Sequence, residues 1–129
     1  MARVLVVDDN EPLRRRVRQV LEQEGHSVQE ADEGKKGLQL VRTFNPDLVI
    51  ADIFMPEMDG LELIGELRET NNAPAVLAIS AGSSVLDHCM LADARLLGAS
   101  DILAKPFEPE ELRRAVGKLL QSTRGSEDS

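Results

Sequence analysis

The stretch LVVDDNEP, residues 5–12, joins a buried-strand pattern to two adjacent acids and the start of a helix. The apolar run ends abruptly at Asp8 and Asp9, and Pro12 follows where the first turn of a helix is expected. Asp9 or Asn10 could cap that helix, because short polar side chains accept hydrogen bonds from its first free amides. Two like charges at the end of a buried strand also suit a bound cation, so a structural and a functional interpretation both stand.

Apolar runs of the same type alternate with helical periodicity along the chain. The runs at 3–7, 47–51 and 74–79 are rich in Val, Leu and Ile, and each predicts a strand buried on both faces. Weaker runs at 26–31 and 100–104 predict edge strands. Apolar residues at helical spacing predict five helices, around residues 13–21, 38–44, 61–67, 86–97 and 112–120. The alternation predicts a single α/β domain in which helices cover both faces of a doubly wound, five-stranded parallel sheet.

Composition excludes several classes of function. The 129-residue chain has 23 acidic and 15 basic residues, and its net charge of -8 argues against a nucleic-acid or anionic membrane surface. Cys89 is the only cysteine, so no internal disulfide can form, which fits a reducing cytosol. The N-terminal apolar run is too short for a signal peptide, and no run approaches the length of a membrane span. We therefore expect a cytoplasmic protein that contacts neither nucleic acid nor membrane directly.

Polar side chains follow the ends of four predicted strands. Asp8 and Asp9 follow the first strand, Asp52 ends the third, Ser80 the fourth and Lys105 the fifth. Taken singly, each of these residues suits a turn, a cap or a solvated surface. The carboxyl ends of parallel strands share one edge of a sheet, where ligands bind in such folds, so we expect the five side chains to converge.

The converging groups suit phosphoryl transfer. Three clustered carboxylates repel one another unless one is protonated or a cation joins them. Carboxylate oxygens with few other protein ligands suit Mg²⁺, which keeps several waters and accepts phosphate oxygens. Lys105 and Ser80 would offer an ammonium and a hydroxyl to the phosphoryl oxygens. The set predicts a site that receives a phosphoryl group with Mg²⁺ as cofactor.

With these motifs in this order, the sequence resembles the receiver domain of bacterial two-component response regulators. The matching motifs are VDD at 7–9, DIFMPEMDG at 52–60, SA at 80–81 and KPF at 105–107. The resemblance leads us to expect a receiver domain over residues 1–121, followed by a frayed polar tail or linker stub over residues 122–129. It also implies a CheY-like fold of the flavodoxin type with strand order 2-1-3-4-5.

The resemblance further implies a role for each site residue. Asp52 would accept the phosphoryl group from the phosphohistidine of a sensor histidine kinase or a histidine phosphotransfer protein. Asp9 would bind Mg²⁺ directly and Asp8 largely through water, with Asp52 and the backbone carbonyl of Phe54 as further ligands. Lys105 would pair with the phosphoryl group. The chain would then act as a signalling switch and not as an enzyme with a separate substrate.

The path from the site to the output departs from the family pattern. The resemblance implies that Ser80 turns toward the phosphoryl group and changes partner binding at the face of the fourth helix and fifth strand. The family often places an aromatic residue three positions before the lysine, where this chain has Ile102. Ser80 and Lys105 are also 25 positions apart, more than is usual in the family. We expect a downstream output domain or effector protein to be controlled without the usual aromatic coupling.

Phe54 is a third departure from the family pattern. It stands two positions past Asp52, where some members of the family carry a polar residue. An apolar side chain cannot hydrogen-bond an attacking water, so we expect slow loss of the phosphoryl group and faster loss in Phe54→Asn.

Two other classes of function remain open alternatives. A degenerate receiver could serve as a constitutive scaffold, a possibility motivated by Ile102, although the complete acidic set counts against it. An enzyme on a similar sheet is the other class. A flavodoxin-type phosphate loop would be repelled by the acids after the first strand, and an Asp-x-Asp phosphatase would need a second acid at Asn10.

The segment RRRVR at residues 14–18 places four arginines on the first predicted helix. A run of like charges usually forms a solvated face. The family resemblance offers a second interpretation, in which Arg14 and Arg18 dock a kinase or a phosphotransfer protein.

Overall fold

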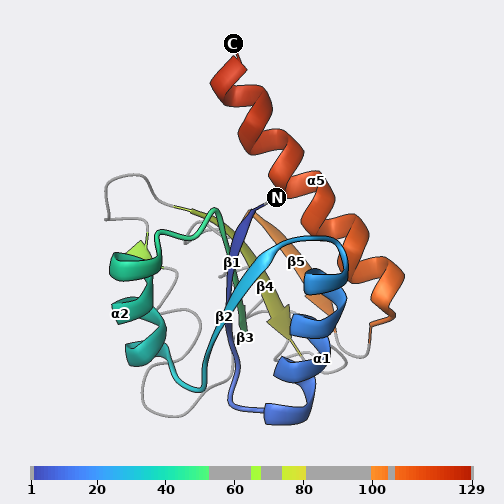
Figure 1. Cartoon of the computed structure of the whole chain (residues 1–129). Coiled ribbons are helices and arrows are strands. Elements are labelled where there is room, and N and C mark those ends of the chain that lie inside the picture. Colours follow the sequence, from blue (N-terminus) through green and yellow to red (C-terminus); the bar gives the residue numbers. More distant parts are fainter. Residues whose placement is uncertain (1, 53–64, 68–73, 81–99, 105–106, 129) are drawn as a thin grey trace.

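The computed structural model of the chain describes residues 2–52, 65–67, 74–80, 100–104 and 107–128. Among these residues, five parallel strands form one sheet, with α2 on one face and α1 and α5 on the other (Figure 1). The strands are β1 (Arg3–Val7), β2 (Ser27–Ala31), β3 (Leu48–Asp52), β4 (Ala75–Ser80) and β5 (Asp101–Ala104). Their order, β2-β1-β3-β4-β5, confirms the doubly wound sheet and its predicted topology.

The continuous apolar sequences of β1 and β3 and the mixed sequence of β2 correspond to different degrees of burial. All of β3 is buried, as is all of β1 after Arg3. Successive side chains of a strand point to opposite faces, so a continuous apolar run requires a covering layer on both sides of the sheet. By contrast, β2 has only two buried positions, and its other residues are exposed or half-buried. As predicted from their weaker apolar character, β2 and β5 lie at the two edges.

The first helix, α1 (Glu11–Gln23), begins where the opening stretch predicts. The N-cap is Asn10, whose side-chain oxygen accepts a hydrogen bond of 3.2 Å from the amide of Leu13. Pro12 lies in the first turn, where the missing amide hydrogen costs nothing because that amide would have no helical partner. Of the two candidate caps, the structure selects Asn10, so Asp9 is not needed for this role.

The helix α2 (Gly34–Phe44) packs closely on β1. It ends at Asn45, whose left-handed backbone (φ 55°) precedes Pro46. A Cβ added at Gly37 would lie 2.7 Å from a methyl carbon of Val7, closer than carbon atoms can approach. The glycine therefore permits the short distance between α2 and the last residue of β1.

The helix α5 (Pro109–Asp128) buries one apolar stripe against the sheet and α1. Its backbone stays helical through residues 122–128, which differs from the frayed tail expected from their polar composition. No proline interrupts this segment, and adding residues to an existing helix is far easier than nucleating one. A linker role for these residues stays a prediction.

Two apolar clusters form the core, one on each face of the sheet. The cluster under α1 and α5 includes Val6, Leu21 and Leu112, and the cluster under α2 includes Val7 and Leu67. Leu67 belongs to a helical stretch at 65–67, within the third predicted helix. The rest of that helix and the whole fourth predicted helix lie outside the described residues. Within the described chain, no helix has the length and apolar character needed to cross a bilayer.

Candidate phosphoacceptor and metal site

The strand register brings two aspartates together at the carboxyl edge of the sheet. Val7 of β1 pairs with Ala51 of β3, so the residues that follow them, Asp8 and Asp52, reach the carboxyl edge at the same level. The amide of Asp8 continues the sheet by donating a hydrogen bond of 3.1 Å to the carbonyl of Ala31 at the end of β2. Strand pairing thus brings Asp8 and Asp52 to the same level of the sheet, as predicted.

Asp9 completes an acidic cluster with Asp8 and Asp52. One carboxylate oxygen from each residue lies within 4.8 Å of the others. Asp8 and Asp52 are only 2% and 6% exposed, whereas Asp9 faces solvent. Charges withdrawn from water repel strongly at such separations, because little solvent screens them. A cation that joins the three oxygens would relieve this repulsion.

The donor set of the cluster fits Mg²⁺. Mg²⁺ prefers oxygen ligands, commonly takes one or two carboxylates and keeps several waters. Two buried carboxylates beside an exposed one would leave part of such an ion open to water and to phosphate oxygens. Asp8, Asp9 and Asp52 are therefore the residues that would hold the ion.

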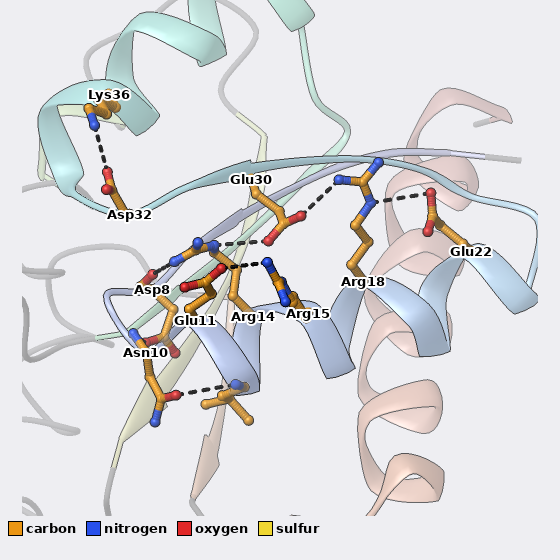
Figure 2. A network of polar contacts seen from close by, with 11 residues as sticks. Asp8, Asn10, Glu11, Arg14, Arg15, Arg18, Glu22, Glu30, Asp32 and Lys36 are labelled. Atoms are coloured by element: carbon orange, nitrogen blue, oxygen red, sulfur yellow. Dashed lines mark hydrogen bonds and ion pairs between the residues drawn. The ribbon is translucent and has the colours of Figure 1, made fainter.

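The loop between β1 and α1 is fixed by hydrogen bonds to both parts of Asp8. Its carboxylate oxygen Oδ1 accepts a hydrogen bond of 2.8 Å from the amide of Asn10. Its backbone carbonyl accepts a hydrogen bond of 2.7 Å from Nη1 of Arg14, as Figure 2 shows. The residue that carries one carboxylate of the cluster is thus held through its side chain and its main chain.

Arg14 is in turn held by an acidic residue on the edge strand. Its Nε donates to Oε1 of Glu30 at 2.9 Å, and Nη1 of Arg18 donates to Oε2 of the same carboxylate at 2.8 Å (Figure 2). Burial acts to raise the pKa of Glu30, but the hydrogen bonds from Arg18 and Arg14 outweigh it, and the pKa lies below its ordinary value. The bond to Glu30 is the main cause of a raised pKa at Arg18.

Only part of the arginine run forms the solvated face that the sequence predicts. Arg15 and Arg16 are exposed, as a solvated face requires. The side chain of Arg14 is only 13% exposed and bonds within the domain, because period-2 alternation turns Glu30 toward α1. An acid on the strand face that also carries Val28 was the signal in the sequence, and the two arginines four positions apart were its partners.

The remaining predicted site residues are described only in part. The backbone of Ser80 ends β4 beside Ala104 of β5, at the same edge of the sheet as Asp52, but its side chain is not described. Phe54 and Lys105 lie outside the described residues, so their roles stay predictions. Ile102 lies in β5, is half-buried and packs against the core cluster beneath α2.

Comparison with known proteins identifies the family that shares these features. A family model described as the response regulator receiver domain matches residues 4–117. The chain is 40% identical over 121 residues to the response regulator MprA of Mycolicibacterium vanbaalenii, a match that covers 94% of this chain and 51% of that protein. The chain therefore spans about half the length of the curated relatives that it matches.

Solved structures support the same assignment of the fold. The receiver domain of the Francisella response regulator 1452 superposes with a TM-score of 0.85 at 32% identity, covering 95% of this chain and 99% of that one. NtrX from Brucella abortus gives a TM-score of 0.89 at 28% identity, covering 98% of this chain but 28% of that one. The same fold thus fills nearly all of one solved chain and a minor part of the other.

Proposed function

This chain belongs to the response regulator receiver domain family, and on that premise we propose that Asp52 accepts a phosphoryl group with the help of Mg²⁺ held by Asp8, Asp9 and Asp52. Receiver domains of two-component systems are signalling switches, and this role applies to the chain as a member of the family. The observation that carries the proposal is the position of Asp52, almost fully buried at the carboxyl edge of the central strand and beside two further carboxylates.

The proposed reaction is a transfer from histidine to aspartate. A carboxylate oxygen of Asp52 attacks the phosphorus of a phosphohistidine, a phosphorus–oxygen bond forms, and the phosphorus–nitrogen bond breaks to release the imidazole. Bound Mg²⁺ supplies charge neutralisation for the phosphoryl oxygens. Lys105 would pair with one phosphoryl oxygen, Ser80 would donate its hydroxyl to another, and the backbone carbonyl of Phe54 would be a further ligand of the ion.

The partners are proposed by chemical class. The phosphoryl donor is a sensor histidine kinase or a histidine phosphotransfer protein. A downstream output domain or effector protein receives the signal, and the greater length of the curated relatives supports an output segment in proteins of this type. Because the position of the usual aromatic residue holds Ile102, which is half-buried and packs against the core cluster beneath α2, we propose that the switch works through Ser80 without an aromatic side chain moving inward.

The central test is mass spectrometry after treatment with a small phosphodonor such as acetyl phosphate and Mg²⁺. The wild-type protein should gain one phosphoryl group, and Asp52→Asn should gain none. Asp47→Asn is a matched control, because Asp47 directly precedes the same strand at the opposite edge of the sheet and should leave labelling intact. Labelling that survives in Asp52→Asn would overturn the assignment of the phosphoacceptor.

The constitutive scaffold is the second candidate, and the position of Ile102 is the observation that favours it. Titration with beryllofluoride and Mg²⁺, followed by NMR, separates the two functions. A switch should show shifted amide signals around Ser80 and β5 that saturate with the titrant. A scaffold should leave these signals unchanged.

A further inference from the structure

Arg14 connects the loop between β1 and α1, which carries Asp8 and Asp9, to the neighbouring strand β2. This strand contributes no carboxylate to the acidic cluster. Its guanidinium bonds the carbonyl of Asp8 at 2.7 Å and the carboxylate of Glu30 at 2.9 Å. Glu30 is held by the sheet, since it pairs in register with Val6 of β1. A planar guanidinium presents several donors in a rigid fork, so both bonds together fix its orientation.

The carbonyl that Arg14 holds belongs to the peptide unit between Asp8 and Asp9. A peptide unit is planar, so the direction of its carbonyl fixes one backbone torsion at each of the two residues. Those torsions decide where the two carboxylates project from the loop. One hydrogen bond from Arg14 therefore constrains two members of the cluster, while the amide of Asn10 constrains the Asp8 side chain itself.

We propose that Arg14 is a positioning residue for the metal site: its bond to the Asp8 carbonyl, anchored by Glu30, sets the geometry in which Asp8 and Asp9 bind Mg²⁺. This role rests on the proposed function, because it concerns the same ion. Arg14 acts through the main chain of the loop and is not itself a ligand. Arg18 supports it by occupying the second oxygen of Glu30, which fixes the rotamer of the shared carboxylate.

The charge of Arg14 and its positioning role predict opposite changes in Mg²⁺ affinity when the residue is replaced, so a binding measurement separates them. A guanidinium near a cation site repels the cation, so removing it should strengthen Mg²⁺ binding if charge were its only influence. The ion pair with Glu30 offsets this repulsion, because the two side chains together carry no net charge. Loss of positioning should instead weaken Mg²⁺ binding. Loss of an outer partner of a metal site typically costs about 10- to 100-fold in affinity.

The experiment measures the Mg²⁺ dissociation constant of the folded protein by calorimetry and by NMR of the loop amides. We expect Arg14→Gln to weaken binding by about tenfold, the lower end of that range, because the lost bond is to the main chain. Arg16→Gln is the matched control: it removes the same charge from an exposed position of the same helix and should change the constant by less than about twofold, since solvent screens it. Arg14→Lys keeps the charge without the fork and should give an intermediate constant.

Thermal unfolding without Mg²⁺ separates positioning from a merely structural role. A residue that only stabilises the fold would lower the melting temperature of the metal-free protein and leave the dissociation constant of the folded protein unchanged. That result, or Mg²⁺ binding to Arg14→Gln that is as tight as or tighter than in the wild type, would overturn the proposal while the phosphoacceptor assignment stands.

If Arg14→Gln does not fold, Arg14→Lys carries the comparison. A wild-type protein that binds no Mg²⁺ would overturn the metal site and this role together, and labelling of Asp52 would still report separately on the phosphoacceptor.

Discussion

The amino and carboxyl edges of the sheet, which are formed by opposite ends of β1 and β3, differ in how they arrange charged groups. At the amino edge, Asp47 accepts a hydrogen bond of 2.9 Å from the amide of Arg3, and its own amide donates to the carbonyl of Arg3 at 2.8 Å. The guanidinium of Arg3 also donates to the carbonyl of Phe44 and lies over its ring. At the carboxyl edge, three carboxylates meet within 4.8 Å.

The comparison shows where stability and function diverge in this domain. The amino edge pairs hydrogen-bond donors with acceptors, so its groups join β1, β3 and the end of α2. The carboxyl edge brings like charges together on the same two strands, an arrangement that opposes folding in the absence of a cation. Sites that break the rules followed elsewhere in a fold are commonly functional, and here the violation coincides with the proposed Mg²⁺ site.

The largest expected effect comes from the same isosteric substitution made at each edge. Asp8→Asn should weaken Mg²⁺ binding by about 10- to 100-fold, as loss of a metal-site partner does. It should also raise the melting temperature of the metal-free protein by a few degrees, because one like charge is removed from the cluster. Calorimetry and thermal unfolding measure the two effects. Asparagine can still accept the hydrogen bond from Asn10, so the loop keeps that contact.

The matched variant at the amino edge should respond with the opposite sign. Asp47→Asn replaces a charged acceptor of the Arg3 amide with a neutral one, so it should lower stability by about 0.5 kcal/mol and leave Mg²⁺ binding unchanged. If both variants lost stability in the metal-free protein, like-charge repulsion at the carboxyl edge would not be the difference between the two edges.

A smaller effect is expected from packing behind the carboxyl edge. Gly37→Ala would place a methyl group 2.7 Å from a side-chain carbon of Val7, so the Val7 side chain, α2 or β1 must shift. We expect a loss of about 1–2 kcal/mol in the free energy of unfolding, measured with urea, as for other overpacked sites. Because Val7 directly precedes Asp8, Mg²⁺ affinity should fall as well.

Gly117→Ala on α5 is the control for this substitution. Among the described residues, no atom outside the adjacent backbone of α5 lies within 4 Å of its added Cβ, so the change should stabilise the helix by up to about 1 kcal/mol. Equal responses at the two glycines would mean that the contact between α2 and β1 does not limit the packing.

The smallest expected effect is a pH dependence at Glu30. Its pKa in the folded protein lies below the ordinary value because hydrogen bonds from Arg18 and Arg14 outweigh burial. The stability it contributes is therefore present above the ordinary pKa of about 4.3 and is lost as pH falls through the lower folded value. Glu30→Gln should be less stable than the wild type near neutral pH, and this deficit should shrink as the solution is acidified below pH ~4.

Thermal unfolding of the metal-free protein at a series of pH values checks this dependence. Asp32→Asn is the control, because the hydrogen bond from Lys36 also lowers the pKa of Asp32, but the pair is exposed and screened by solvent. A deficit in Glu30→Gln that stayed constant from neutral to acidic pH would assign it to lost packing and not to the charge.

Short-range signals in the sequence predicted much of the fold and site. Apolar runs predicted the strands, and the difference between strong and weak runs predicted which strands lie at the edges. Asp8, Asp9 and Asp52 were predicted to meet because parallel strands end at one edge. The helical backbone of residues 122–128 was not predicted, since local composition does not report a helix extended from an anchored turn.

Side-chain period and local hydrogen bonding were enough to predict the parallel sheet, the start of α1 and the carboxylates at the strand ends. The three-dimensional structure was needed to show that Asn10 and not Asp9 is the cap, and that Arg14 bonds Asp8 and Glu30 and does not face solvent. The pairing of Arg14 with Glu30 depends on the register of β2 with β1 and on the rotation of α1 above them. Such relations join residues distant in the chain, and no local pattern specifies them.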